Sequence, residues 1–156
     1  MTGLAETIER LESMPAFLEA AVGSVSGERL RYRPTPEDFS LLEQACHLRD
    51  LEREGYLVRV RRMLTEREPD LQPFDGAAVA RERKYLEQDA RLAAQDFAAA
   101  RRELTGLLAP LTEEDLGRRA RFDGDPITFR ALVEMILEHD RGHRDEIERL
   151  LARKED

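Results

Sequence analysis

Cysteine, tryptophan and long apolar segments are scarce or missing in this chain. Among its 156 residues there is one cysteine, Cys46, and no tryptophan, so an internal disulfide and any scaffold that depends on one are excluded. No apolar run approaches the roughly 20 residues that a helix needs to cross a bilayer. The first residues are too acidic for a signal peptide. We therefore expect a soluble, cytoplasmic protein with no membrane partner.

A net positive charge is also missing. The chain carries 25 Lys and Arg against 33 Asp and Glu, which gives a formal net charge of −8. Binding to a phosphate backbone requires a positive field, so nucleic acid is not expected as a partner. Short basic runs, such as Arg59 with Arg61 and Arg62, lie among acidic residues and are interpreted as solvated helix faces.

The length and composition suit one helical domain. A chain of 156 residues can bury a core without a disulfide or a structural metal. Its commonest residues, Leu, Ala, Arg and Glu, favour helix over sheet. We expect a single domain over residues 1–156, because the sequence shows no internal repeat, low-complexity tract or linker.

Four segments have helical periodicity. Pro15 is expected to kink the first segment or to start a new turn within it. Ser40 and Glu43 form a capping box that begins the second segment, and Thr128 caps the fourth. The predicted helices cover residues 4–22, 40–66, 76–108 and from 128 to near the C-terminus. With no convincing strand of period two, this pattern predicts an all-α four-helix bundle, with residues 23–39 as a long crossover loop between helices 1 and 2.

Shorter signals lie between the third and fourth helices. Thr112 and Asp115 have the spacing of a one-turn capped helix, and residues 123–126 form a turn. Selection of a ligand is expected at the bundle ends, in residues 23–39 and in the turns near Asp70 and Asp123. Three side chains could touch a ligand there: Tyr32, Tyr56 and Arg141.

All three histidines of the chain can meet at one point. At about 100° per residue, His139 and His143 fall in the middle of the apolar stripe of the fourth helix, where the pattern would otherwise place Leu or Ile. His47 lies on the shoulder of the stripe of the second helix. Three imidazoles from two helices can form a metal site with an open coordination position, which is typical of a catalytic metal.

The alternative is that the histidines are ordinary: two core imidazoles with hydrogen-bond partners and one at the bundle edge. An isolated His-x-x-x-His on a helix is a common coincidence. The zinc-protease pattern fits poorly, because Asp140 rather than Glu follows His139. A di-iron carboxylate bundle requires two Glu-x-x-His motifs, and the nearest matches have the wrong residue or spacing.

Several neighbours could support such a site. Cys46 adjoins His47 but points about 100° away around the helix, so it is expected to be core filler rather than a ligand. Metal-bound imidazoles usually donate their second nitrogen to a hydrogen-bond acceptor. Three carboxylates could orient a ligating imidazole in this way: Glu43, Asp140 and Glu146.

The run Pro36-Glu-Asp-Phe-Ser-Leu-Leu-Glu-Gln-Ala-Cys-His47, followed by Glu138-His-Asp-Arg-Gly-His143, resembles the DinB-like superfamily. In that family the second helix opens with an aromatic-Ser pair and carries a histidine further along, and the last helix supplies His-x-x-x-His. The resemblance covers essentially the whole chain. Phe39 stands where tryptophan is usual.

The resemblance implies a four-helix bundle, often dimeric, in which His47, His139 and His143 hold a divalent metal ion such as Zn or Ni. Imidazole ligation by itself would also suit Cu or Fe. Characterised relatives include metal-dependent thiol S-transferases, which join bacillithiol or mycothiol to electrophiles, and a mycothiol-dependent isomerase. We therefore predict a homodimeric, metal-dependent thiol S-transferase that joins a low-molecular-weight thiol, such as bacillithiol or mycothiol, to a small-molecule electrophile. The alternatives are a metal-dependent hydrolase and a non-enzymatic, stress-response metal-binding bundle or dimeric scaffold.

Overall fold

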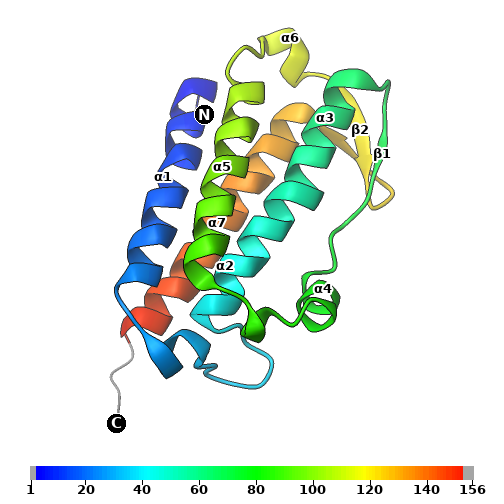
Figure 1. Ribbon diagram of the computed structural model, residues 1–156. Helices are drawn as coiled ribbons and strands as arrows, with labels where there is room; N and C mark the ends of the chain where they lie inside the picture. The colour runs from blue at the N-terminus through cyan, green and yellow to red at the C-terminus, as the bar shows by residue number, and fades with distance from the viewer. Residues whose placement is uncertain (1–2, 153–156) are drawn as a thin grey trace.

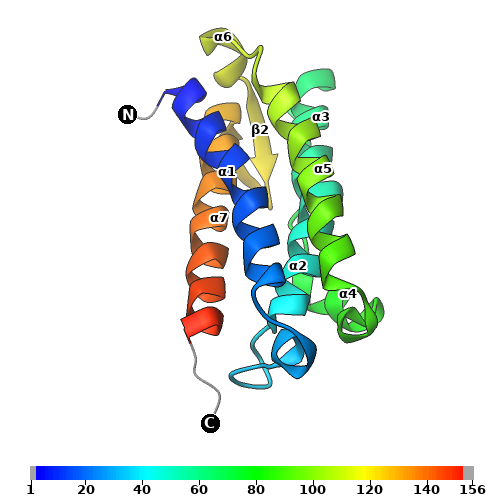
Figure 2. The same cartoon turned by 60° about the vertical axis from the view of Figure 1, so that its left-hand side comes forward.

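The computed structural model describes residues 3–152, and its main part is a bundle of four long helical segments (Figures 1 and 2). The predicted four-helix bundle is confirmed. The second segment is a continuous run of two α-helices joined by a π-helical stretch. The bundle elements are α1 (Leu4–Gly23), α2 (Leu41–Asp50), η2 (Leu51–Tyr56), α3 (Leu57–Thr65), α5 (Ala90–Leu108) and α7 (Phe129–Ala152).

Helices α1 and α2 each pack against both α5 and α7. The apolar core forms two clusters. One lies toward the small sheet and includes Val60, Leu104 and Ile136, and the other lies toward the crossover loop and includes Leu18, Leu48 and Phe97. Within residues 3–152, none of the helices has the length and apolar character required to cross a membrane.

Short elements close the two ends of the bundle. The small sheet lies beside α3 at one end, and α4 lies beside α2 toward the other (Figure 1). The predicted capping box of Ser40 with Glu43 is confirmed, as are the predicted one-turn capped helix at Thr112 and the cap at Thr128. In the structure Thr112 and Asp115 also form a capping box. The short elements are η1 (Gly27–Arg31), β1 (Asp70–Leu71), α4 (Gly76–Glu82), η3 (Tyr85–Glu87), α6 (Glu113–Leu116), β2 (Arg119–Phe122) and β3 (Asp125–Thr128).

The prediction of one helix over residues 76–108 is wrong in its first third. Helix α4 ends at Glu82, and Lys84 adopts a left-handed conformation with φ of 51°, which a helix cannot contain. Helix α5 then begins at Ala90, where the Asp89 side chain accepts a hydrogen bond from the backbone N–H of Leu92. Residues 76–108 therefore form two separate helices, α4 and α5, and the chain changes direction between them.

Within residues 3–152, three short strands form a small sheet that no alternating pattern in the sequence indicated. Strand β1 pairs in parallel with β2, and β2 pairs antiparallel with β3. Asp123 and Gly124 connect β2 to β3 with φ of 50° and 87°, as a type I′ hairpin turn requires. Each strand has only two to four residues, too few to show an alternating pattern in the sequence.

Pro15 lies inside α1 without ending it. Because proline has no N–H, the carbonyl of Leu11, four residues earlier, loses its helical partner. Arg101 replaces that partner, since its Nη1 donates to the Leu11 carbonyl at 2.9 Å. The same guanidinium pairs with Glu52 (Nε to Oε2, 2.7 Å) and with Asp140 (Nη1 to Oδ2, 2.7 Å). This buried triad links α1, η2, α5 and α7.

Candidate metal centre

The structure brings two of the three predicted ligands together. His47 on α2 and His143 on α7 face each other across the bundle, with ring centroids 4.9 Å apart. His47 is 9% exposed, and the rings of Phe39 and Phe74 pack beside it with centroids 5.2 and 6.3 Å away. The burial lowers the pKa of His47 to about 4, and the neighbouring His143 adds to the effect. His47 is therefore a neutral imidazole at neutral pH.

One nitrogen of His47 has no partner. Among residues 3–152, its Nδ1 is the single buried side-chain nitrogen or oxygen without a hydrogen bond. An unpaired buried polar group costs about 1–3 kcal/mol and often marks the place of a water molecule or an ion. The unpaired nitrogen fits an imidazole that is kept to bind something outside the protein chain.

Gly76 lies directly against this ring. A Cβ added at Gly76 would lie 2.6 Å from Cε1 of His47 and 2.8 Å from Nδ1, closer than real contacts allow. Gly76 opens α4, so the position of that helix depends on the absence of a side chain there. The local backbone thereby fixes the position of the His47 ring.

We expect Gly76→Ala to lower the free energy of unfolding by about 1–3 kcal/mol, because the new methyl group must displace the His47 ring. Urea denaturation measures the change. Gly106→Ala is the matched control, since a Cβ there meets nothing within 4 Å and alanine favours helix, so that variant should gain about 0.5–1 kcal/mol. A Gly76→Ala protein as stable as its parent would show that the ring has room to move.

His143 is held from behind by two side chains. Its Nδ1 lies 3.1 Å from Oε1 of Gln44 and 3.7 Å from Oε2 of Glu146. Gln44 in turn donates from Nε2 to Oε2 of Glu146 at 2.5 Å. Interaction with His143, and then the hydrogen bond from Gln44, lower the pKa of Glu146 and keep its carboxyl group ionised. The Nε2 edge of the ring is left without these partners.

His139 lies one turn earlier on α7 and is held by Tyr56. The Tyr56 hydroxyl lies 2.5 Å from Nδ1 of His139, and the two rings stack with centroids 5.9 Å apart. Burial, and then the nearby His143, lower the pKa of His139. Over residues 3–152, no three side chains of His, Cys, Asp or Glu lie together in an arrangement that could hold a metal ion. Only His47 and His143 of the three predicted ligands face each other, while the exposed His139 pairs with Tyr56.

The π-helical segment explains how one helical run reaches both histidines of α7. His47 and Tyr56 are nine residues apart, and at about 100° per residue a regular α-helix would place them on opposite faces. A π turn contains an extra residue, which shifts the helical phase of the residues after it. Segment η2 begins four residues after His47 and ends at Tyr56, so His47 contacts His143 while Tyr56 contacts His139.

Two of the three carboxylates suggested by the sequence have other partners. Asp140 belongs to the buried triad with Arg101, and Glu43 accepts two hydrogen bonds from Arg33, each of 2.6 Å. Only Glu146 contacts a histidine. Arg141 pairs with Glu138 on the exposed face of α7, away from the imidazoles.

Cys46 is core filler, as expected. Its side chain is fully buried, and its Sγ lies 3.7 Å from Oε1 of Gln88. Burial raises the pKa of its thiol to about 11, so the group stays protonated and unreactive.

Three residues of the site were not found by sequence reasoning: Gln44, Tyr56 as a partner of His139, and Gly76. Gln44 is three residues before His47 and Glu146 three after His143, a spacing that places each on the same helix face as its histidine. That spacing could have indicated Gln44. Neither Gly76 nor Tyr56 has such a signal, because their positions depend on α4 and on the π-helical segment.

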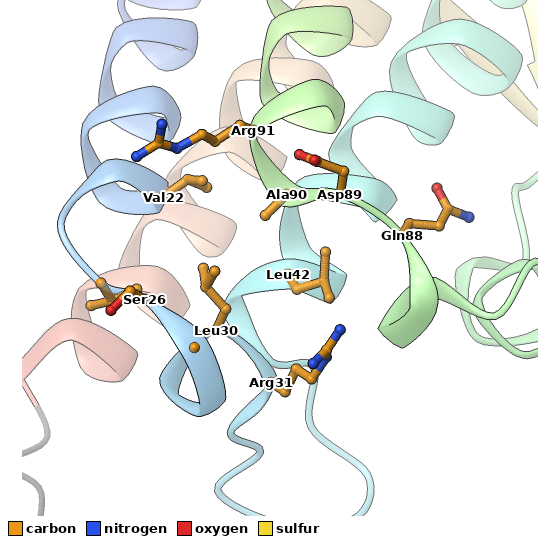
Figure 3. Close-up of a pocket in the computed structure, with 11 residues that line it drawn as sticks. Val22, Ser26, Leu30, Arg31, Leu42, Gln88, Asp89, Ala90 and Arg91 are labelled. Atoms are coloured by element: carbon orange, nitrogen blue, oxygen red, sulfur yellow. The ribbon is translucent and has the colours of Figure 1, made fainter.

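Two hollows lie near the crossover loop. One, of about 260 Å³, is lined by Phe39, Gln44 and Glu146, which contact the histidine pair, together with Asp38, Arg149 and others, but neither histidine lines it. The other, of about 340 Å³, lies between the end of α1, η1 and the start of α5, with Arg31 and Arg91 at opposite sides of Leu30 and Leu42 (Figure 3). Of the described residues that line this second hollow, none is a histidine.

Comparison with known proteins gives the family. The sequence profile of the DinB superfamily matches residues 10–147. The chain belongs to the DinB superfamily. The predicted resemblance is therefore confirmed. No curated protein shows a significant match to this DinB-superfamily chain.

Two solved structures have the same fold. YfiT from Bacillus subtilis, described as "a probable metal-dependent hydrolase with an unusual four-helix bundle topology", is 23% identical, with a TM-score of 0.86 over 94% of this chain and 85% of YfiT. The DinB-like protein YjoA from Bacillus subtilis is 16% identical, with a TM-score of 0.60 over 96% of this chain and 94% of YjoA. At these identities the similarity establishes the four-helix bundle and its DinB-like topology.

Proposed function

We propose that this DinB-superfamily protein is a metal-dependent enzyme that transfers a low-molecular-weight thiol to a small electrophile, with His47, His139 and His143 as the ligands of one divalent cation. The main support is the convergence of the His47 and His143 rings, 4.9 Å apart, at a buried imidazole with an unpaired nitrogen. The description of YfiT as a probable metal-dependent hydrolase on the same fold also supports dependence on a metal.

The charge state of the imidazoles suits this role. Histidine coordinates a metal only as the neutral ring. Burial holds the pKa of His47 at about 4 and lowers that of His139, so neither ring must lose a proton to bind a cation at neutral pH. Neutral imidazoles are good ligands for Zn and Ni.

The nearby carboxylates leave the activation of a nucleophile to the metal. Asp140 and Glu43 are tied to arginines, and Glu146 is bonded to Gln44 behind His143, so none is free to act as a general base. A bound divalent cation would supply the missing activation, since it lowers the pKa of a coordinated thiol enough to give thiolate at neutral pH. The thiol must come from outside the chain, because Cys46 is buried and protonated.

The hollow beside the histidine pair supports a small-molecule substrate. Its volume of about 260 Å³ is near the lower end of ligand pockets in proteins. Phe39 and Leu150 give it apolar walls, and Arg149 and Glu146 give it charges of both signs. A small polar molecule fits these features better than a polymer does.

The test begins with metal binding. Titration of Zn²⁺ against a chromophoric chelator should give one ion per chain, and His143→Ala should weaken binding by more than about 100-fold, beyond the effect of losing a supporting residue. Arg141→Ala is the control on the same helix, because its side chain faces solvent. Equal affinity in the parent and in His143→Ala would remove His143 from the site.

Turnover is tested with the metal-loaded protein, bacillithiol or mycothiol, and a generic alkylating electrophile. We expect thiol consumption in the parent and in Arg141→Ala but not in His143→Ala. If the parent consumes thiol no faster than His143→Ala does, the proposed transferase activity is contradicted.

Hydrolysis is the second candidate, and the description of YfiT favours it. Ester and amide substrates turned over without any thiol would support that activity. If the metal raises the melting temperature but neither activity is found, a non-enzymatic metal-binding bundle is the better interpretation.

A further inference from the structure

Gln44 occupies an unusual position behind the proposed metal centre. It is 1% exposed, yet its amide contacts two groups of α7: Oε1 lies 3.1 Å from Nδ1 of His143, and Nε2 lies 2.5 Å from Oε2 of Glu146. It is three residues before His47 on α2, so the same helix supplies one imidazole of the pair and the support of the other. The proposed thiol chemistry does not by itself assign Gln44 a role.

The direction of each hydrogen bond follows from the donors and acceptors. An ionised carboxylate can only accept, so the NH₂ group of Gln44 must face Glu146. The amide oxygen then faces His143, and an amide oxygen can only accept. Nδ1 of His143 must therefore carry the proton. In a neutral imidazole with a proton on Nδ1, the lone pair lies on Nε2.

We propose that Gln44 and Glu146 are positioning residues that hold His143 in the Nδ1–H tautomer, so that Nε2 is the nitrogen offered to a cation. The purpose of this arrangement rests on the proposed function, but the tautomer itself is a property of the metal-free protein. Glu146 sets the orientation of the Gln44 amide, and Gln44 sets the proton position on His143. Neither side chain needs to touch the cation or the substrate.

His139 provides an internal comparison. Its Nδ1 faces the Tyr56 hydroxyl, which can donate or accept, and it has no contact with Gln44 among the interactions of the described residues. A change at Gln44 should therefore affect the tautomer of His143 and leave that of His139 as it was.

The tautomer can be measured directly. Two-bond ¹⁵N–¹H correlation spectra of the metal-free protein at about pH 8, where histidine of ordinary pKa is neutral, distinguish protonated from unprotonated ring nitrogens. We expect His143 of the parent to be in the Nδ1–H form. Gln44→Met, which keeps the shape but loses the acceptor, and Glu146→Ala, which frees the amide to turn, should both shift His143 toward the Nε2–H form.

Two variants guard against a purely structural effect. Glu146 is 49% exposed, so Glu146→Ala should fold even if Gln44→Met does not. Glu148→Ala changes an exposed carboxylate of the same helix and should leave every histidine signal unchanged. In all variants the His139 signals should match those of the parent.

Zn²⁺ affinity gives a second measurement. Loss of an orienting partner typically weakens a metal site by about 10–100-fold, which we expect for Gln44→Met and Glu146→Ala but not for Glu148→Ala. The inference is overturned if His143 of the parent is in the Nε2–H form, or if neither variant changes its tautomer. If the parent binds no Zn²⁺, the proposed function fails, and the spectra of the metal-free protein still decide the tautomer.

Discussion

Arg101→Met is expected to lower the free energy of unfolding by about 3–5 kcal/mol, the usual cost of removing one partner from a buried ion pair. Arg101 is 1% exposed and bonds to Glu52, which is fully buried, and to Asp140. Without the guanidinium, two carboxylates would be left in the core with no counter-charge. The Leu11 carbonyl, freed by Pro15, would lose its donor as well. Urea denaturation at neutral pH measures the loss.

Arg102→Met is the matched control for this prediction. Arg102 is the next residue of α5 but is exposed, so its replacement should change stability by less than about 0.5 kcal/mol. A triple variant in which Arg101→Met is combined with Glu52→Leu and Asp140→Leu should regain most of the stability, because no charge is then left buried. A loss below about 1 kcal/mol for Arg101→Met alone would show that the triad is not the electrostatic centre of the core.

Acid is expected to destabilise the metal-free protein through His47. The folded-state pKa of His47 is about 4, mainly because the ring is buried; His143 and His139 lower it further, while Glu146 and Asp50 oppose them. The unfolded chain has a histidine pKa of about 6.5 and so takes up a proton that the folded protein refuses. Stability from this group is fully present above about pH 6.5 and is lost as the pH falls toward 4. The loss can reach about 3 kcal/mol.

His47→Gln isolates this contribution, since glutamine is polar and does not titrate in this range. In urea denaturation of both proteins with a chelator present, the parent should lose up to about 3 kcal/mol more stability than His47→Gln as the pH falls from about 6.5 to 4. Other titrating groups are common to the two proteins and cancel in the difference. Parallel curves would mean that His47 takes up its proton in the folded state as easily as in the unfolded chain.

Local signals predicted much of the fold. The capping boxes at Ser40 and Thr112 fix helix starts through contacts three residues apart, so they are readable in the sequence. The break between α4 and α5 was missed because its turning residue is Lys84 rather than a glycine or asparagine. Strand β1 was missed because its pairing with β2 joins residues far apart, such as Asp70 with Arg121, and β2 and β3 were missed because each has only four residues.

The candidate site was predicted from periodicity only in part. The spacing of His139 and His143 predicted that both lie on the inner face of α7. In the structure His143 is half-buried and meets His47, whereas His139 is exposed. The hydrogen bond that holds His139 to Tyr56 could not be predicted, because a regular helix would turn Tyr56 away from α7. Coordination of one cation by all three histidines stays a prediction.

Segment η2 makes the length of the second helical run as important as its composition. Deleting one residue between Leu51 and Tyr56 would let the run close as a plain α-helix and rotate everything after it by about 100°. The residues of α3 that fill the core would then turn toward solvent. A change of identity at exposed Glu54 alters a single surface contact, whereas removal of that same residue would bring α2 and α3 out of register with α7.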